Sequence, residues 1–152
     1  MVRIVILLVM YLVSQIIEAQ TTNSSNEEFD RGVNEYVTIN VTVPKVSGNE
    51  GVVLFALYNS NEKFMKRETM ATKEGEIKNG AVTVSFHKVA SGTYAIVCLH
   101  DKNGNKRMDF NENGMLFEDY GISNNVMLMG PPNFEEAKFA VGNKSLDLTI
   151  NF

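Results

Sequence analysis

Residues 100–114 read HDKNGNKRMDFNENG, and they concentrate oxygen-bearing side chains in one short segment. Counted from Asp101 as the first position, oxygen donors recur at the third, fifth, ninth and twelfth positions, and a backbone carbonyl is available at the seventh. An EF-hand loop binds calcium from these positions, because calcium is a hard cation that takes about six to eight oxygen ligands. We therefore predict a site for one calcium ion with these ligands: Asp101, Asn103, Asn105, the carbonyl of Arg107, Asp109 and Glu112.

Two features separate this segment from an EF-hand. The sixth position, where an EF-hand has glycine, is Lys106, and the glycine stands at the fourth position instead. A residue with a side chain at the sixth position must tolerate the turn there, with a positive φ, at some energetic cost. A strand, not a helix, precedes the loop. A plain polar turn remains the alternative, since Asn and Asp side chains commonly stabilise turns.

Other chemistry is poorly supported by the residue pattern. His100 and Asp101 are adjacent at a strand end, so their side chains point to opposite faces and do not form an acid–base pair. A structural role is therefore expected for His100. Glu118 and Asp119 are interpreted as polar groups of a loop and not as a hydrolytic pair. We expect the chain not to be an enzyme; an envelope hydrolase that uses the loop carboxylates is the alternative.

We expect strands to position this loop, because apolar and polar residues alternate with a period of two along much of the chain. Valines and Ile39 alternate with polar residues from Tyr36 to Val43, which predicts a strand with one wet face. Residues 51–58 and 93–100 are apolar at nearly every position, which predicts central strands covered on both sides. Further strands are predicted at 81–89 and 145–152. Residues 63–72 fit a helical turn or an irregular strand.

The segment PNFEEAKFAV, which starts at Pro132, offers at most one or two helical turns. About seven short strands in one domain predict an all-β fold, an antiparallel β-sandwich of immunoglobulin-like or transthyretin-like type with a long polar loop. A small closed barrel is the alternative. The apolar residues of the long loop are expected to pack inward: Met115, Leu116, Phe117, Met127, Leu128 and Met129.

The first residues have the composition of a targeting signal. Arg3 precedes an apolar run over 4–13, whose length fits a signal peptide and is short for a membrane span. We predict a signal peptide at 1–19, cleaved after Ala19, a flexible leader at 20–35 and a single domain at 36–152. An uncleaved anchor is the alternative. The mature protein is expected to be exported, either periplasmic or secreted, without a membrane span.

Charge and cysteine content exclude some partners. The net charge is −4 and no basic cluster occurs along the sequence, which argues against nucleic-acid binding and against binding to an anionic membrane. Cys98 is the only cysteine, so no internal disulfide can form. It lies in the apolar run YAIVCL, where a buried and inert thiol is expected.

Four segments together resemble a family of small exported bacterial proteins, domain of unknown function 2141. They are GTYAIVCLHDKNGN from Gly92, MDFNENG from Met108, EDYGISNN from Glu118 and GPPNFEEAKF from Gly130. The resemblance extends over about residues 37–152. It implies export and a β-rich fold, but no established activity. The chain departs from the family pattern at Lys106, usually Gly, and at Leu116, usually Pro.

The loop alone is similar to the calcium loops of B-repeat domains in bacterial surface adhesins. The matching residues are Asp101, Asn103, Asn105, Asp109, Glu112 and Gly114, and Lys106 does not match. Since those loops lie on a β-sandwich, the likeness removes the objection that flanking helices are missing. The sequence thus predicts an exported module of the cell envelope, structural or binding an envelope or extracellular partner, with a calcium-stabilised loop. A metal-free structural domain is the alternative.

Overall fold

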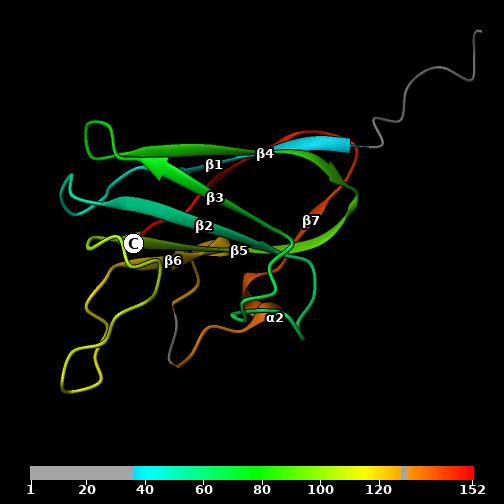
Figure 1. Cartoon of the computed structure of the whole chain (residues 1–152). Helices are drawn as coiled ribbons and strands as arrows, with labels where there is room; N and C mark the ends of the chain where they lie inside the picture. Colours follow the sequence, from blue (N-terminus) through cyan, green and yellow to red (C-terminus); the bar gives the residue numbers. More distant parts are fainter. Residues whose placement is uncertain (1–35, 128–129) are drawn as a thin grey trace, which may run out of the picture. The chain divides into compact units, whose positions relative to one another are not determined.

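The computed structural model describes residues 36–127 and 130–152 (Figure 1). The predicted signal peptide and leader lie outside these residues. The described elements, in chain order, are β1 (Tyr36–Val43), β2 (Val52–Tyr58), β3 (Ala71–Glu76), β4 (Val82–Ala90), β5 (Gly92–Asp101), β6 (Tyr120–Ile122), the 3₁₀ turn η1 (Ser123–Asn125), the helix α2 (Phe134–Ala137), β7 (Phe139–Val141) and β8 (Leu146–Thr149). No helix in this part of the chain is long and apolar enough to cross a membrane.

Two sheets form a sandwich, as predicted. One has the order β4-β1-β8, and the other has the order β3-β2-β5-β6, with β7 also paired to β5. The pairing is antiparallel everywhere except between β1 and β8, which run parallel. The prediction of an antiparallel β-sandwich is confirmed, with one strand more than the estimate of about seven.

The alternation in β1 has the predicted consequence. Val37, Ile39, Val41 and Val43 are all buried, while the residues between them are half-buried. Their side chains pack with the inner residues of the second sheet, among them Phe55, in one hydrophobic core. A strand with one buried face is typical of a sheet that meets a second sheet on that side only.

The strands β2 and β5 are covered on both sides over part of their length, as their composition predicts. Their inner side chains, such as Ile96, belong to the core between the sheets. On the outer face, Ala95 and Val97 pack with Phe64 and with Phe134 of α2 in a second apolar cluster. Figure 1 shows α2 and the connection after β2 on that side of the sheet. The burial of both faces explains the nearly continuous apolar runs.

Some short elements had no clear sequence signal. β3, with the sequence ATKEGE, is an edge strand whose exposed face is charged. β6 and β7 have three residues each, too few to show alternation. The segment after Pro132 forms one helical turn, α2, and then enters β7, as the prediction of one or two turns allowed. Residues 61–65 form a turn, with a positive φ at Met65, and the chain is irregular from there to β3.

Gly51 brings the start of β2 against the end of β5. Its φ is +71°, and a Cβ atom there would lie 2.0 Å from the carbonyl oxygen of Asp101. Only glycine permits this approach. The close packing holds the first residue of the predicted loop at the end of the sheet.

Candidate functional site: the loop at the end of β5

Asp101 organises the loop that begins at its own position. Its side chain is fully buried, and its Oδ1 atom accepts the backbone N–H groups of Gly104 (2.8 Å) and Asn105 (3.1 Å). Its Oδ2 atom accepts the N–H of Lys106 at 2.9 Å. Hydrogen bonds to a carboxylate are stronger than those between neutral groups. Asp101 therefore holds the backbone of residues 104–106 in a tight turn around one carboxylate.

Lys106 takes the conformation expected of the glycine that it replaces. Its φ is 59°, in the left-handed region that costs a residue with a side chain about 1–2 kcal/mol. Its ammonium group lies 3.0 Å from a carboxylate oxygen of Glu74 on the edge strand β3. The positive charge is thus paired with a carboxylate outside the loop.

The side chains of Asn103, Asn105 and Asp109 converge. The amide nitrogens of Asn103 and Asn105 donate to Oδ2 of Asp109 at 2.6 Å and 2.7 Å. Their amide oxygens accept backbone N–H groups further along the loop, from Asn105 at 3.0 Å and Arg107 at 2.8 Å. The structure therefore brings together the residues of the first, third, fifth and ninth positions.

Glu118, which the sequence analysis did not assign to the site, closes the loop. Its side chain is buried, and it accepts the N–H of Lys102 at 3.0 Å and the N–H of Asp109 at 3.3 Å. One carboxylate thus joins the first and last parts of the segment 102–109. Spacing along the sequence did not reveal this contact, because a hairpin separates Glu118 from the loop.

Glu112 lies in that hairpin. The N–H of Asn111 donates to the carbonyl of Met115 at 2.8 Å, and Phe110 pairs with Leu116 in a β-bridge. Glu112 is exposed in the turn between them, and no hydrogen bond within residues 36–127 and 130–152 joins it to Asp109. The hairpin extends away from the sheets, as the yellow segment of Figure 1 shows.

The hairpin corrects one prediction. The apolar residues of this region were expected to pack inward, but Met115, Leu116, Phe117 and Met127 are exposed. The exposed fraction reaches 64% for Phe117 and 91% for Met127. For the residues at 115–117 the reason is geometric, because a two-stranded hairpin that leaves the sandwich has no neighbouring layer to cover its side chains; Met127 lies outside the hairpin, after η1. Leu128 and Met129 lie outside the described residues.

Three carboxylates of the loop are held by hydrogen bonds. Asp101, Asp109 and Glu118 are linked to one another through Asn105 and the N–H of Asp109. Over the described ranges, none of these carboxylates forms an ion pair with Lys, Arg or His. In that part of the chain, no three His, Cys, Asp or Glu side chains are grouped closely enough to hold a metal alone. A cation here needs amide or carbonyl oxygens as well.

His100 has a structural environment, as its position in the strand predicts. Its ring is fully buried and stacks with Phe152 at a centroid distance of 6.4 Å. Its Nε2 atom is 2.8 Å from the carbonyl oxygen of Glu50, so this nitrogen carries the proton and donates it. Its Nδ1 atom lies 3.9 Å from Oδ2 of Asp119.

Asp119 is held by polar neighbours on the other side. The hydroxyl of Ser47 donates to its carboxylate and holds the pKa of the Asp119 carboxyl below its usual range. The ammonium of Lys102, at 3.1 Å, acts in the same direction. Asp119 thus fixes the path of the chain next to Glu118.

Burial raises the pKa of the Cys98 thiol, which keeps the thiol protonated.

The segment SNN at 123–125 joins several elements. The buried hydroxyl of Ser123 accepts the N–H of Ile96 at 2.9 Å and donates to the carbonyl of Ala137. Asn124 donates to the carbonyls of Glu136 and Lys138, and the amide of Asn125 binds the backbone of β8. These turn residues therefore tie β5, α2 and β8 to one another.

Comparison with known proteins gives one match. Residues 41–149 fit the model of a family described as an uncharacterized protein conserved in bacteria (DUF2141). No curated protein and no solved structure matches the chain. The matched range includes the whole loop of 101–118 and the segment SNN.

Proposed function

The chain belongs to the bacterial family DUF2141, and from this premise we propose that it is an exported binding or structural module of the cell envelope whose loop of residues 101–118 is stabilised by one calcium ion. The supporting observation is that the carboxylates of Asp101, Asp109 and Glu118 are linked through Asn105 and the N–H of Asp109, and that none of them forms an ion pair in the described part of the chain. Since three such side chains are not grouped closely enough in the described residues to hold a metal alone, the proposed ion would also take amide and carbonyl oxygens of the loop.

The chemistry of the donors fits calcium. The available ligands are carboxylate oxygens, the amide oxygens of Asn103 and Asn105, and the carbonyl of Arg107, all of which are hard oxygen donors. A half-turn of either amide exchanges its nitrogen and oxygen and turns the oxygen toward Asp109, at the cost of the hydrogen bond that this oxygen accepts from the N–H of Asn105 or Arg107. The bound ion would neutralise the carboxylates and hold the loop.

Glu118 is our candidate for the carboxylate that completes the site. It is buried next to Asp109, whereas Glu112, the ligand expected from spacing, lies in the exposed turn of the hairpin. A carboxylate that already joins both ends of the loop can add an ion to its contacts with little loss of side-chain entropy. The proposed ligand set therefore has Glu118 in the role predicted for Glu112.

Thermal unfolding with and without calcium tests this proposal. An ion that binds only the folded state at about a hundred times its Kd stabilises by about 2.7 kcal/mol, which raises the Tm of a domain of this size by roughly 10 °C. We expect this shift with calcium at about 10 mM, relative to protein in chelator. A Tm that does not respond to calcium would contradict the proposal.

Asp109→Asn and Asp147→Asn form a matched pair of variants. Both remove one negative charge, but Asp147 lies on β8 and binds Asn40 at 2.8 Å. Asp109→Asn should abolish most of the calcium shift, and Asp147→Asn should retain it even if the variant is less stable. Equal shifts in both variants would place the ion elsewhere.

Export is tested separately. When the full chain with a C-terminal tag is expressed in a bacterium, the mature protein should begin at Gln20 and should leave the cytoplasm. Mass spectrometry of the purified protein gives the N-terminus directly. A chain that keeps residues 1–19 and stays with the inner membrane would instead indicate an uncleaved anchor.

A further inference from the structure

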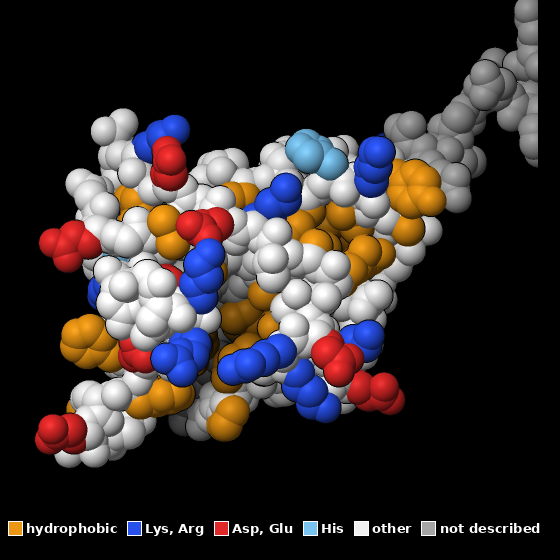
Figure 2. Space-filling model, in the orientation of Figure 1, with side chains coloured by type: hydrophobic (Ala, Val, Ile, Leu, Met, Phe, Trp, Pro, Cys, Tyr) orange, Lys and Arg blue, Asp and Glu red, His pale blue; other side chains and the backbone are white. Residues whose placement is uncertain are grey.

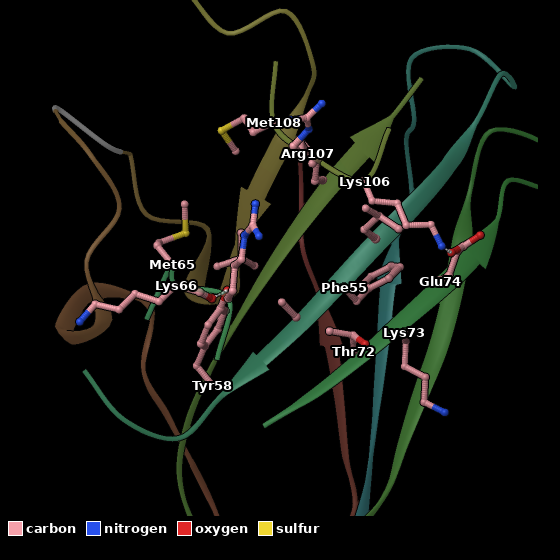
Figure 3. A pocket seen from close by; sticks show the side chains of 15 residues that line it. Phe55, Tyr58, Met65, Lys66, Thr72, Lys73, Glu74, Lys106, Arg107 and Met108 are labelled. Carbon is pink, nitrogen blue, oxygen red and sulfur yellow. Dashed lines mark hydrogen bonds and ion pairs between the residues drawn. The ribbon is translucent and has the colours of Figure 1, made fainter. Parts of the chain in front are cut away.

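A cavity of about 670 Å³ lies on the outer face of the second sheet, over β2, β3 and β5 (Figure 3). The turn at residues 65–67 borders it near the end of β2, and residues 106–108 border it near the end of β5. Because β2 and β5 are antiparallel, these borders lie at opposite ends of the strands, and the cavity runs along them. Its size falls within the range of sites for small molecules.

The floor of the cavity is apolar. It is formed by outward side chains of the two central strands, Leu54 and Ala56 from β2 and Val97 and Leu99 from β5. Near α2 the same sheet face is covered by Phe64 and Phe134, but Leu54 and Leu99 remain only half-buried. This part of the face can therefore bury further apolar surface.

The floor offers no hydrogen-bonding groups to a ligand. Along Val52–Tyr58 the backbone of β2 is paired with β3 on one side and with β5 on the other. The side chains of the floor are hydrocarbon. A peptide lying here would bury its own amide groups without partners, at a cost of about 1–3 kcal/mol for each group. An alkyl chain has no such groups, so the floor favours an alkyl chain.

The rim of the cavity is basic. Lys66 and Arg67 stand at one end and Lys106 and Arg107 at the other, and Lys106 pairs with Glu74 at 3.0 Å. Within the described residues, Lys66, Arg67 and Arg107 form no ion pair with a carboxylate. Figure 2 shows Lys and Arg side chains around a hollow where apolar side chains surface. In a chain of net charge −4, this concentration of unpaired positive charge favours an anionic ligand.

We propose that this groove binds a small anionic amphiphile, a single alkyl chain that ends in a carboxylate or a phosphate. The alkyl chain lies on Leu54, Ala56, Val97 and Leu99, and the anionic group meets the cations of the rim. Arg67 is the principal candidate for this contact, because it lies outside the calcium loop, whereas the ammonium of Lys66 extends away from the groove in Figure 3. The inference is independent of calcium, since neither the floor nor this end of the rim belongs to residues 101–118.

An anionic amphiphile can come from free solution or from a lipid bilayer. The groove is concave and lies along the strands, so a bilayer surface would not reach its floor. A free monomer can enter it. We therefore assign the monomer as the ligand, and binding to vesicles is the competing outcome.

Calorimetric titration of the full chain with laurate, below its micellar concentration and in chelator, tests the proposal. Laurate should bind once per chain and saturate, while dodecanol and inorganic phosphate alone should each bind at least about tenfold more weakly. From octanoate to laurate, affinity should rise roughly two- to fourfold for each methylene that is buried. The absence of saturable laurate binding, or equal binding of dodecanol, would overturn the proposal.

A pair of charge-reversed variants locates the site. Lys66→Glu/Arg67→Glu reverses two rim charges, and Lys45→Glu/Lys144→Glu reverses two exposed lysines that do not line the groove. The rim variant should lose about tenfold in laurate affinity, and the control should stay within about twofold of the parent chain. Equal losses of laurate affinity in the two variants would mean that net charge alone determines binding, and would contradict a site at the rim.

Vesicles distinguish the two sources of the ligand. Under the conditions in which laurate binds, phosphatidylglycerol and phosphatidylcholine vesicles should both leave the protein in the supernatant. Binding to phosphatidylglycerol vesicles without binding of monomeric laurate would assign the basic rim to a membrane surface and overturn the groove proposal. Since all titrations run in chelator, their failure would not affect the calcium proposal.

Discussion

The carboxylate of Asp101 accepts the backbone N–H of Lys106 at 2.9 Å, and Lys106 is held at a φ of 59°. One side chain thus selects a left-handed conformation for a residue that ordinarily avoids it. The turn of the loop therefore carries an energetic cost in the backbone of Lys106.

Lys106→Gly should stabilise the protein relative to Lys106→Ala. Both changes remove the exposed pair with Glu74, but only glycine adopts a positive φ without strain. We expect glycine to be more stable than alanine by about 1 kcal/mol, measured by urea unfolding in chelator. If alanine is equally stable, residues 104–106 are not strained in the folded protein.

Glu118→Gln and Glu112→Gln separate the two candidates for the final calcium ligand. The first change places an amide N–H₂ group against the backbone N–H of either Lys102 or Asp109, so this variant should lose about 1–3 kcal/mol in chelator and most of its calcium shift. Glu112→Gln should change neither the free energy of unfolding nor the calcium shift. If Glu112→Gln loses the calcium-dependent shift in Tm, Glu112 is a ligand as the spacing predicts.

Ser123→Ala should destabilise the domain by about 2–3 kcal/mol. The change leaves the N–H of Ile96 and the carbonyl of Ala137 buried without their hydroxyl partner. Ser91→Ala, at an exposed position between β4 and β5, is the matched control and should stay within about 0.5 kcal/mol of the parent. Chemical denaturation measures both. A small effect at Ser123 would mean that water replaces the hydroxyl.

Cys98 should make the protein less stable at alkaline pH. Burial raises the pKa of the folded thiol above its ordinary value of 9.0, so the unfolded chain ionises first. Stability is fully present below pH 9.0 and falls above it, by up to about 1.4 kcal/mol per pH unit. Between pH 7.5 and 10, the parent should lose about 1.4 kcal/mol more than Cys98→Ala. Parallel losses would contradict a buried thiol.

Phe117→Ser should be tolerated, whereas Phe134→Ala should not. Phe117 is 64% exposed in the hairpin, and Phe134 is 6% exposed in the outer apolar cluster. We expect a change within about 0.5 kcal/mol for the first and a loss of about 3–5 kcal/mol for the second. Urea unfolding of the two variants checks the contrast. A large loss in Phe117→Ser would indicate that the base of the hairpin packs against the domain in solution.

The sandwich was predictable because burial of one or both faces leaves a periodic pattern in the sequence. β1 has the bounds that its alternation predicts. β3 left no such pattern, because Lys73 and Glu74 occupy an exposed edge where solubility, not packing, determines the residues. The prediction that the apolar hairpin residues pack inward was wrong. The sequence shows that a side chain is apolar, but it does not show whether another layer of the fold lies over it.

The site was predictable only where it is local. Asp101, Asn103, Asn105 and Asp109 come together because short-range turns bring neighbouring residues into contact. Glu118 returns to the loop through the hairpin, and no spacing rule describes that path. The basic rim was missed for a similar reason: Lys66 and Arg107 belong to distant segments, and only the fold brings them to one cavity.

The parallel pairing of β8 with β1 has a consequence for the order of folding. It joins positions as far apart as Thr38 and Ser145, 107 residues along the chain, and it places Ile150 in the core. A ribosome must therefore synthesise nearly the whole domain before the first strand can gain its second neighbour. Until then the sheet that contains β4 and β1 stays open at the edge where β8 pairs.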